Sequence, residues 1–262
     1  MVTPRSHEGS VASSRPAASA GADALPLHRR AIVNRLYHVI SPHLDDAALS
    51  CALLLAANPG SSVTTVFAGG PPSVRPLTEW DRLAGYFPDG ADVAGIRRGE
   101  DISASALLRA KPVHLEYWDR QYRGDRYGYQ GPDEEELREA ITAELLQRGP
   151  ADYWVIPLGL GHPDHRLVAE AGLTLAEREA GEFYLYEELP YAAELKSEVV
   201  SRKRDLAERG FVLKEDPALD ISDDRGLKSA VIRCHVSQRR LLRRRVWRTR
   251  RQPERVWKLL RG

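Results

Sequence analysis

Cysteine and long apolar runs are scarce in this chain of 262 residues, and both absences limit what it can be. The two cysteines, Cys51 and Cys234, are too few for a disulfide framework or a thiolate metal site. The apolar run around Cys51, "ALSCALLLAA", is about half of the roughly 20 residues that a membrane-spanning helix needs. The N-terminal residues lack the basic-then-apolar order of a secretory signal. We therefore expect no transmembrane segment and a reducing, cytoplasmic setting.

Charge is unevenly distributed along the chain. Residues 239–262 contain eleven Lys and Arg against one Glu, so the rest carries −9 within an overall net charge of +1. Such a segment can contact nucleic acid, a phosphorylated substrate or a membrane surface. It can also be a solvated helical tail that packs Trp247 and Trp257 on the domain while its arginines balance an acidic body. We favour the tail, because charge runs on exposed faces are common, and we expect no nucleic-acid partner.

The remaining chain divides into two parts. Residues 1–27 are rich in Ser, Ala, Pro and Gly with few large apolar side chains, which predicts disorder because little surface can be buried. Residues 28–238 are the expected folded domain. The interval 119–133 within it has no clear period, and a loop this long is often a lid or substrate wall. The sequence gives no indication of the oligomeric state.

Short β-branched and aromatic runs alternate with helical patterns in the expected domain. The expected strands are 35–41, 61–68, 112–119, 151–159 and 182–189, and the expected helices are 45–58, 92–108, 133–149 and 164–179, with further helical segments in 200–238. This alternation indicates βαβ units. The predicted fold class is α/β, a single Rossmann-like domain with a doubly wound, mostly parallel sheet and helices on both faces. No Gly-x-Gly-x-x-Gly follows the first strand, which argues against dinucleotide binding.

Candidate metal ligands follow two of the expected strands. The first strand leads into "SPHLDD" (41–46), and the fourth leads into "GLGHPDHR" (159–166). Because ligands of open α/β sheets bind beyond the carboxyl ends of the strands, the fold can bring both motifs to one edge.

The residue types in these motifs suit a catalytic zinc ion. Such zinc commonly takes three His or carboxylate ligands and leaves a fourth place for water. His43, Asp46 and a histidine of the second motif would supply these ligands, and Asp45 would remain free to take a proton from water. Of His162 and His165, one can bind the metal while the other faces the substrate.

Each motif alone has a simpler interpretation. An Asp-Asp pair at a helix start can be a cap, and "HPDH" can be a turn. Their occurrence together at matching junctions favours a metal site.

Non-haem iron oxygenases use the same ligand types. They usually place the first His and the acid one residue apart on a β-barrel, whereas here two residues separate them at a strand–helix junction. Hydrolysis is therefore favoured over oxygenation.

On these motifs the sequence resembles the LmbE-like family of zinc-dependent deacetylases, which includes the N-acetylglucosaminyl-phosphatidylinositol (PIG-L) and mycothiol-pathway deacetylases. "SPHLDDAALSC" is similar to the family's first motif, usually Pro-His-Pro-Asp-Asp-Glu, and "GHPDHR" to its second. Weaker similarities are "RRGED" (97–101), "YEELPYA" (186–192), "SQ" (237–238) after Lys228, and "ERVW" (254–257), so the resemblance covers about 34–258.

The resemblance implies roles for individual residues. His43, Asp46 and His165 would bind Zn²⁺. Asp45 would be the general base, and His162 would stabilise the oxyanion or protonate the leaving amine.

Two further residues would contact the substrate. Arg97 is similar to a substrate-contacting arginine in sugar-processing members, and Asp119 lies near the position of a sugar-binding acid. The sequence departs from the family where Leu44 replaces the usual proline, Ala47 the usual glutamate, and Glu188 a commoner aspartate.

The implied activity of residues 28–238 is zinc-dependent hydrolysis of an N-acetyl amide on an amino sugar or glycoconjugate, which releases acetate and a free amine. Two alternatives remain open. One is a zinc amidase that acts on a non-acetyl amide, for which the loop at 120–132 would shape the pocket. The other is a polyanion-binding module with a non-catalytic metal site. The acetylated substrate and its pathway are not determined by the sequence.

Overall fold

The computed structural model describes residues 35–84, 86–148, 151, 153–217, 219, 221, 224–238, 240 and 251–262. The segment predicted to be disordered, 1–27, and most of the basic tail lie outside these residues. The strands are β1 (Tyr37–Ser41), β2 (Ser62–Thr65), β3 (Lys111–His114), β4 (Tyr153–Pro157), β5 (Glu182–Tyr186), β6 (Phe211–Lys214) and β7 (Val256–Arg261). The helices are α1 (Asp46–Ser50), α2 (Ala52–Ala57), α3 (Glu79–Ala84), α4 (Val93–Leu108), α5 (Glu134–Gln147), α6 (Pro163–Arg178), α7 (Tyr191–Glu194), α8 (Lys196–Glu208) and α9 (Arg225–Arg233), with 3₁₀ turns at Arg120–Tyr122 and Asp125–Tyr127.

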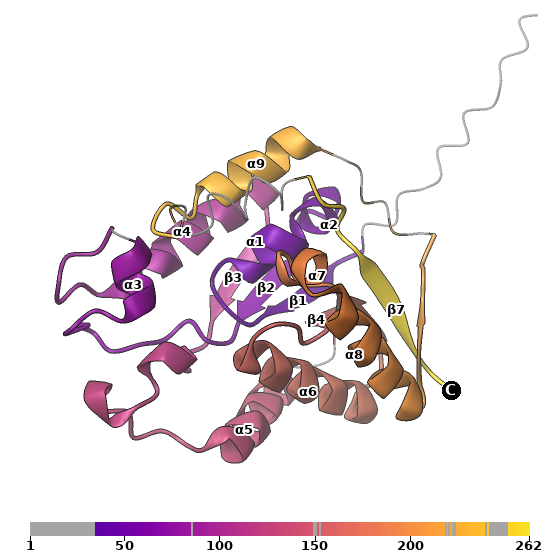
Figure 1. The fold of residues 1–262 in the computed structure, drawn as a ribbon. Coiled ribbons are helices and arrows are strands. Elements are labelled where there is room, and N and C mark those ends of the chain that lie inside the picture. Colours follow the sequence, from indigo (N-terminus) through magenta and orange to yellow (C-terminus); the bar gives the residue numbers. More distant parts are fainter. Residues whose placement is uncertain are drawn as a thin grey trace, which may run out of the picture. The chain divides into compact units, whose positions relative to one another are not determined.

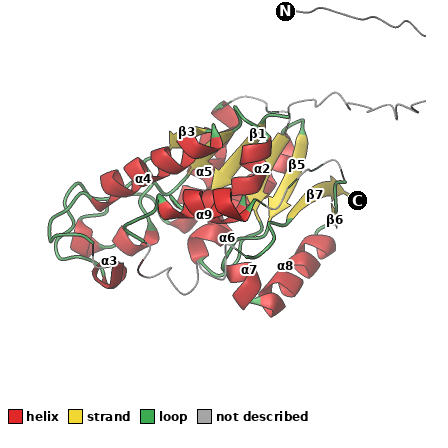
Figure 2. Cartoon of the chain, turned by 90° about the horizontal axis from the view of Figure 1, so that it is seen from above, coloured by secondary structure: helices red, strands yellow, loops and turns green. Residues whose placement is uncertain are grey.

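The strands form one seven-stranded sheet in the order β3-β2-β1-β4-β5-β7-β6 (Figures 1 and 2). The pairs from β3 through β5 are parallel, and β7 runs antiparallel to both β5 and β6. Helices cover both faces: α1, α2, α4 and α9 lie on one, and α5, α6 and α8 on the other (Figure 1). The predicted single α/β domain with a mostly parallel sheet is confirmed.

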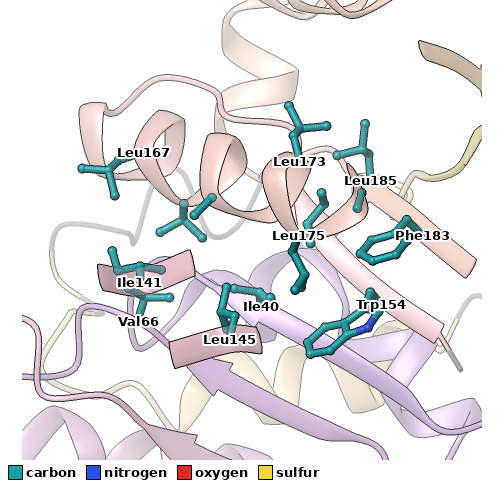
Figure 3. Close-up of a cluster of buried hydrophobic side chains, with 14 of the residues drawn as sticks. Ile40, Val66, Ile141, Leu145, Trp154, Leu167, Leu173, Leu175, Phe183 and Leu185 are labelled. Carbon is teal, nitrogen blue, oxygen red and sulfur yellow. The ribbon is translucent and has the colours of Figure 1, made fainter. Parts of the chain in front are cut away.

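The sheet is buried on both faces because its central strands are apolar at consecutive positions. Val39 and Val155 belong to the hydrophobic cluster under α1, α2 and α4, whereas their neighbours Ile40 and Ile156 belong to the cluster under α5 and α6. Successive side chains of a strand point to opposite faces, so an unbroken apolar run serves two cores. Figure 3 shows the second cluster, in which Trp154 packs among leucines of the helices.

The helix expected over 45–58 is two short helices that meet at Cys51. The carboxylate of Glu254 accepts the N–H groups of Leu53 at 3.0 and 3.1 Å and of Leu54 at 3.3 Å. Because these are orphan donors at the start of α2, a carboxylate near the end of the chain stabilises the restart of the helix. The prediction of one continuous helix was wrong because that acceptor is distant in sequence.

Two other sequence predictions are corrected by the sheet. Residues 256–261, expected in a helical tail, form β7, and residues 211–214, expected to be helical, form β6. Val256 and Leu259 are buried in β7, and the indole of Trp257 donates to Glu187 at 3.0 Å. Pairing with β5 and β6 satisfies the β7 backbone and overrides local preference. Within the described part of the chain, every helix is too short or too polar to cross a bilayer.

Replacing Glu254 with alanine should lower the free energy of unfolding by about 3–5 kcal/mol, because it leaves a buried cation without its partner. Lys228 Nζ lies 3.0 Å from Glu254 Oε1, and the two side chains are 1% and 0% exposed. Urea denaturation measures the change. The matched control is Glu116→Ala, which removes an exposed ion pair with Arg98 and should change stability by about 1 kcal/mol or less. Equal losses of unfolding free energy in the two variants would contradict a stabilising role for the buried pair of Lys228 and Glu254.

Candidate metal centre

The two predicted motifs meet at the carboxyl ends of β1 and β4, which are neighbours in the sheet. The chain leaves β1 toward β2 on one side and β4 toward β5 on the other, so this edge is a topological switch point, where α/β proteins bind ligands. His43 lies in the turn between β1 and α1, and His165 lies in the first turn of α6.

Three side chains converge there in a group able to hold a metal ion. Asp46 Oδ2 lies 3.1 Å from His165 Nε2 and 3.3 Å from His43 Nδ1. One ligand atom from each of the three residues falls within 4.8 Å of the others. The same Asp46 oxygen accepts the backbone N–H of His43 at 2.9 Å, which fixes the carboxylate relative to the turn.

The electrostatics of this group favour a positive charge. Burial raises the pKa of Asp46, but the imidazoles of His165 and His43 outweigh burial and hold that pKa well below its usual range. Burial likewise opposes the charged form of His165, yet Asp46 and Glu188 raise its pKa to about 9. Because a bound cation can replace such protons, the donor set and its charge both fit a divalent metal.

Asp45 is available for chemistry because it does not cap a helix. It occupies the N-cap position of α1, but its side chain makes no capping hydrogen bond. Asp45 is 9% exposed and lines the pocket. Burial, and then the charge of Asp46, raise its pKa to about 7.

His162 is held by the helix that follows it. Its Nδ1 accepts the backbone N–H of Asp164 at 3.1 Å, so the neutral ring carries its proton on Nε2. Burial and the charges of His43 and His165 lower its pKa to about 4. His162 therefore offers a neutral N–H donor at neutral pH.

Asp164 is a site residue that the sequence did not single out. It is fully buried, and its Oδ2 lies 3.1 Å from His43 Nε2 and accepts the backbone N–H of Arg120 at 3.1 Å. Its other oxygen pairs with Arg123. The signal was present in "HPDH", where the acid between the histidines also fits a simple turn. Asp164 fastens the loop predicted to form a substrate wall to the histidine turn.

The two predicted substrate residues lie at the same pocket. Arg97 is 6% exposed and donates to Asp81 of α3 at 2.8 Å, and Tyr122 donates to the other oxygen of Asp81 at 2.8 Å. Asp119 accepts the side-chain amide of Gln121 at 2.7 Å. All the predicted site residues line this pocket: His43, Asp45, Asp46, Arg97, Asp119, His162 and His165.

Comparison with known proteins gives consistent matches. A sequence model of the GlcNAc-PI de-N-acetylase (PIG-L) family matches residues 38–176. The 2'-N-acetylparomamine deacetylase of Streptomyces fradiae is 34% identical over 190 residues, which cover 66% of this chain and 63% of the relative, so the match spans less than two thirds of that protein.

Solved structures are similar over most of the chain. A deacetylase of teicoplanin biosynthesis in complex with bog is 27% identical with a TM-score of 0.66, covering 86% of this chain and 98% of that one. The zinc-inhibited form of teicoplanin deacetylase is 26% identical with a TM-score of 0.64, at the same coverage.

Proposed function

Because the chain belongs to the GlcNAc-PI de-N-acetylase (PIG-L) family, we propose that it uses Zn²⁺ to remove the acetyl group from an N-acetylated amino sugar or its glycoconjugate. The observation that carries the proposal is the convergence of His43, Asp46 and His165 beside a pocket lined by Asp45. The deacetylase activity named for the relatives supports the reaction, and a neighbour solved in a zinc-inhibited form supports zinc binding by a protein of this fold.

His43, Asp46 and His165 would hold the ion in this proposal. When bound, zinc acidifies a water molecule and polarises the amide carbonyl. Asp45 would accept a proton from the water molecule whose oxygen attacks the carbonyl carbon. Its buried, uncapped carboxylate, with a pKa near 7 before metal binding, suits proton transfer near neutral pH.

His162 stabilises the developing negative charge on the carbonyl oxygen. Its Nδ1 is occupied by the N–H of Asp164, so Nε2–H is the group free to donate. A pKa of about 4 supports this role over protonation of the amine. The proton held by Asp45 then passes to the nitrogen as the C–N bond breaks, which gives acetate and a free amine.

Arg97 and Asp119 bind sugar hydroxyl groups in this scheme. The contact of Arg97 with Asp81 fixes its guanidinium at the pocket wall, and Gln121 fixes the Asp119 carboxylate. Their opposite charges supply both donors and acceptors.

The test is acetate release by purified full-length protein with measured metal content. Substrates are N-acetylglucosamine, 2'-N-acetylparomamine and an N-acetylglucosaminyl glycopeptide. We expect acetate and amine in equal amounts from at least one, loss of activity with a chelator, and recovery with stoichiometric zinc. Zinc-loaded protein that releases no acetate from any of the three would refute the proposal.

A further inference from the structure

Glu188 lies behind the metal group and contacts two parts of it. The residue follows β5 and is 0% exposed. Its Oε1 accepts the backbone N–H groups of Gly159 at 2.7 Å and Leu160 at 2.9 Å. The same oxygen lies 3.4 Å from Nδ1 of His165. One carboxylate thus joins the turn that leads to His162 and the imidazole of a proposed metal ligand.

The two ring nitrogens of His165 face different partners. Nε2 faces Asp46 at 3.1 Å, on the side of the metal group, whereas Nδ1 faces Glu188. Among the described residues, buried His165 Nδ1 and Glu188 Oε2 have no hydrogen-bond partner. Buried polar atoms are usually paired. A small shift would let Nδ1–H donate to the Glu188 carboxylate, the arrangement that commonly orients metal-binding histidines.

The turn held by Glu188 needs such an anchor. Gly159 and Gly161 adopt φ values of +91° and +70°, which side-chain-bearing residues rarely adopt. A Cβ at Gly159 would also lie 2.9 Å from that of Ala169. The N–H groups accepted by Glu188 therefore fix the backbone just before His162.

We propose that Glu188 is a positioning residue that aligns both histidines of the second motif. It holds His165 as the Nδ1–H tautomer with Nε2 directed at the metal, and it holds the turn that places His162. This inference rests on the proposed zinc centre. It adds a residue more than twenty positions beyond the second motif, just after a different strand.

Glu188→Gln tests the alignment, because Gln retains an oxygen for the two N–H groups but loses the charge that His165 faces. We expect zinc affinity, measured by chelator competition, to fall about 10- to 100-fold. At saturating zinc we expect lower kcat with KM changed less than about twofold, because the substrate does not touch Glu188.

The matched control is Glu187→Gln at the adjacent position. Glu187 is also buried, but it pairs with Lys203 at 2.7 Å and accepts the indole N–H of Trp257, away from the pocket. It should lower stability without changing zinc affinity. Zinc affinity and kcat unchanged in Glu188→Gln would overturn the proposal.

A measurement on the unmodified protein covers the case in which Glu188→Gln does not fold. Nitrogen NMR of zinc-loaded protein should show His165 protonated at Nδ1, and a deprotonated Nδ1 would overturn the proposal. Wild-type protein that binds no zinc would instead refute the metal centre itself.

A separate observation concerns the pocket mouth. Trp80 lines the pocket yet is 39% exposed, whereas the other lining residues are buried or half-buried. One helical turn along α3, Leu83 is 53% exposed, and Tyr86 just beyond is 46% exposed. Trp80 therefore offers an exposed aromatic ring at the pocket, continuous along the chain with further exposed apolar side chains, and such exposed apolar surface marks a binding site.

The rim differs in charge from the base of the pocket. Asp45, Asp46 and Asp119 lie in the pocket, where the acetylated sugar would bind. On α3, by contrast, the exposed Glu79 is balanced by the exposed Arg82, and Asp81 is buried against Arg97, so the rim adds no excess of carboxylates to bind a polycationic aglycone. We infer that the rim binds an aryl or alkyl aglycone attached to the acetylated sugar, so the proposed deacetylase acts on apolar glycosides in preference to free or polycationic amino sugars.

Acetate release from 4-nitrophenyl N-acetylglucosaminide and from free N-acetylglucosamine tests this inference. We expect kcat/KM about 10-fold higher for the aryl glycoside, which corresponds to one well-buried aromatic contact. Trp80→Ala should reduce that ratio toward one, whereas the control Ile102→Ala, exposed on α4 and outside the pocket, should preserve it. Equal kcat/KM values for the two substrates in the wild-type protein would overturn the inference. Faster turnover of 2'-N-acetylparomamine than of the aryl glycoside would also overturn it. No acetate from any substrate would remove the proposed function and this inference with it.

Discussion

Replacing His165 with alanine should deprive the protein of its metal. His165 is 1% exposed, and its Nε2 lies 3.1 Å from Asp46. Loss of a direct ligand should weaken zinc binding by more than the about 100-fold that outer-shell substitutions cost. We expect wild type to retain about one zinc per chain after dialysis and His165→Ala to retain almost none, with acetate release lost in parallel.

The control for this variant is His114→Ala. His114 Nε2 lies 2.8 Å from Asp101 and its side chain is 13% exposed, so it is also a largely buried histidine that is hydrogen-bonded to a carboxylate, but it lies outside the pocket. It should keep its zinc. If His165→Ala bound zinc with wild-type affinity, the ligand set given above would be incorrect.

The metal-free protein adds a pH dependence to the same prediction. The pKa of His165 is raised to about 9, so its protonated form stabilises the fold. That contribution is complete below the unfolded pKa of about 6.5 and is lost as pH rises through about 9. Urea denaturation of chelated samples should therefore show a larger deficit for His165→Ala at pH 6.5 than at pH 9.5.

The metal group was predictable from sequence because its determinants are local. A strand that ends in "SPHLDD" and another that ends in "GLGHPDHR" needed only the parallel-sheet rule to be placed together. That rule brings His43, Asp46 and a histidine of the second motif together, and the choice of His165 over His162 came from the family resemblance.

The supporting residues were not predictable in the same way. Glu188 acts on the second motif from the end of a different strand, and Asp164 gains its role from Arg123 in a loop without periodic pattern. Asp81, which holds Arg97, lies in a helix that was not predicted. Their functions depend on contacts between segments that are distant in sequence. The periodicity of apolar residues predicts helices and strands but does not predict such contacts.

The position of β7 in the sheet was also not predictable from the local sequence. A short apolar segment such as 256–261 fits a helix or a strand, and the choice was made by the free edge of β5. Glu254 accepts the backbone N–H of Leu53 at the start of α2 across a separation of 201 residues. A prediction from the residues near α2 alone therefore could not find the break between α1 and α2.

Replacing Asp45 with asparagine should separate catalysis from metal binding. The amide is close in size to the carboxylate but cannot accept a proton from water, and loss of a general base typically lowers the rate about 100- to 10,000-fold. Helix α1 should be unaffected, because the Asp45 side chain makes no capping hydrogen bond. We expect wild-type zinc content and a kcat at least about 100-fold lower. The control is Asp92→Asn, a true cap of α4 that accepts from Gly95 at 2.8 Å and should retain full activity.

Stability of the metal-free Asp45→Asn variant provides an independent check. The pKa of Asp45 is raised to about 7 by burial and by Asp46, so its ionised form destabilises the fold increasingly as pH rises above the unfolded value of about 3.9. Asparagine removes this penalty, so chelated Asp45→Asn should be more stable than chelated wild type at pH 8 and similar at pH 4. A residue retained for packing would show the opposite, a loss of stability with activity intact. Only a carboxylate kept for chemistry should show lower turnover together with higher stability, because functional sites hold charge in places that folding alone disfavours.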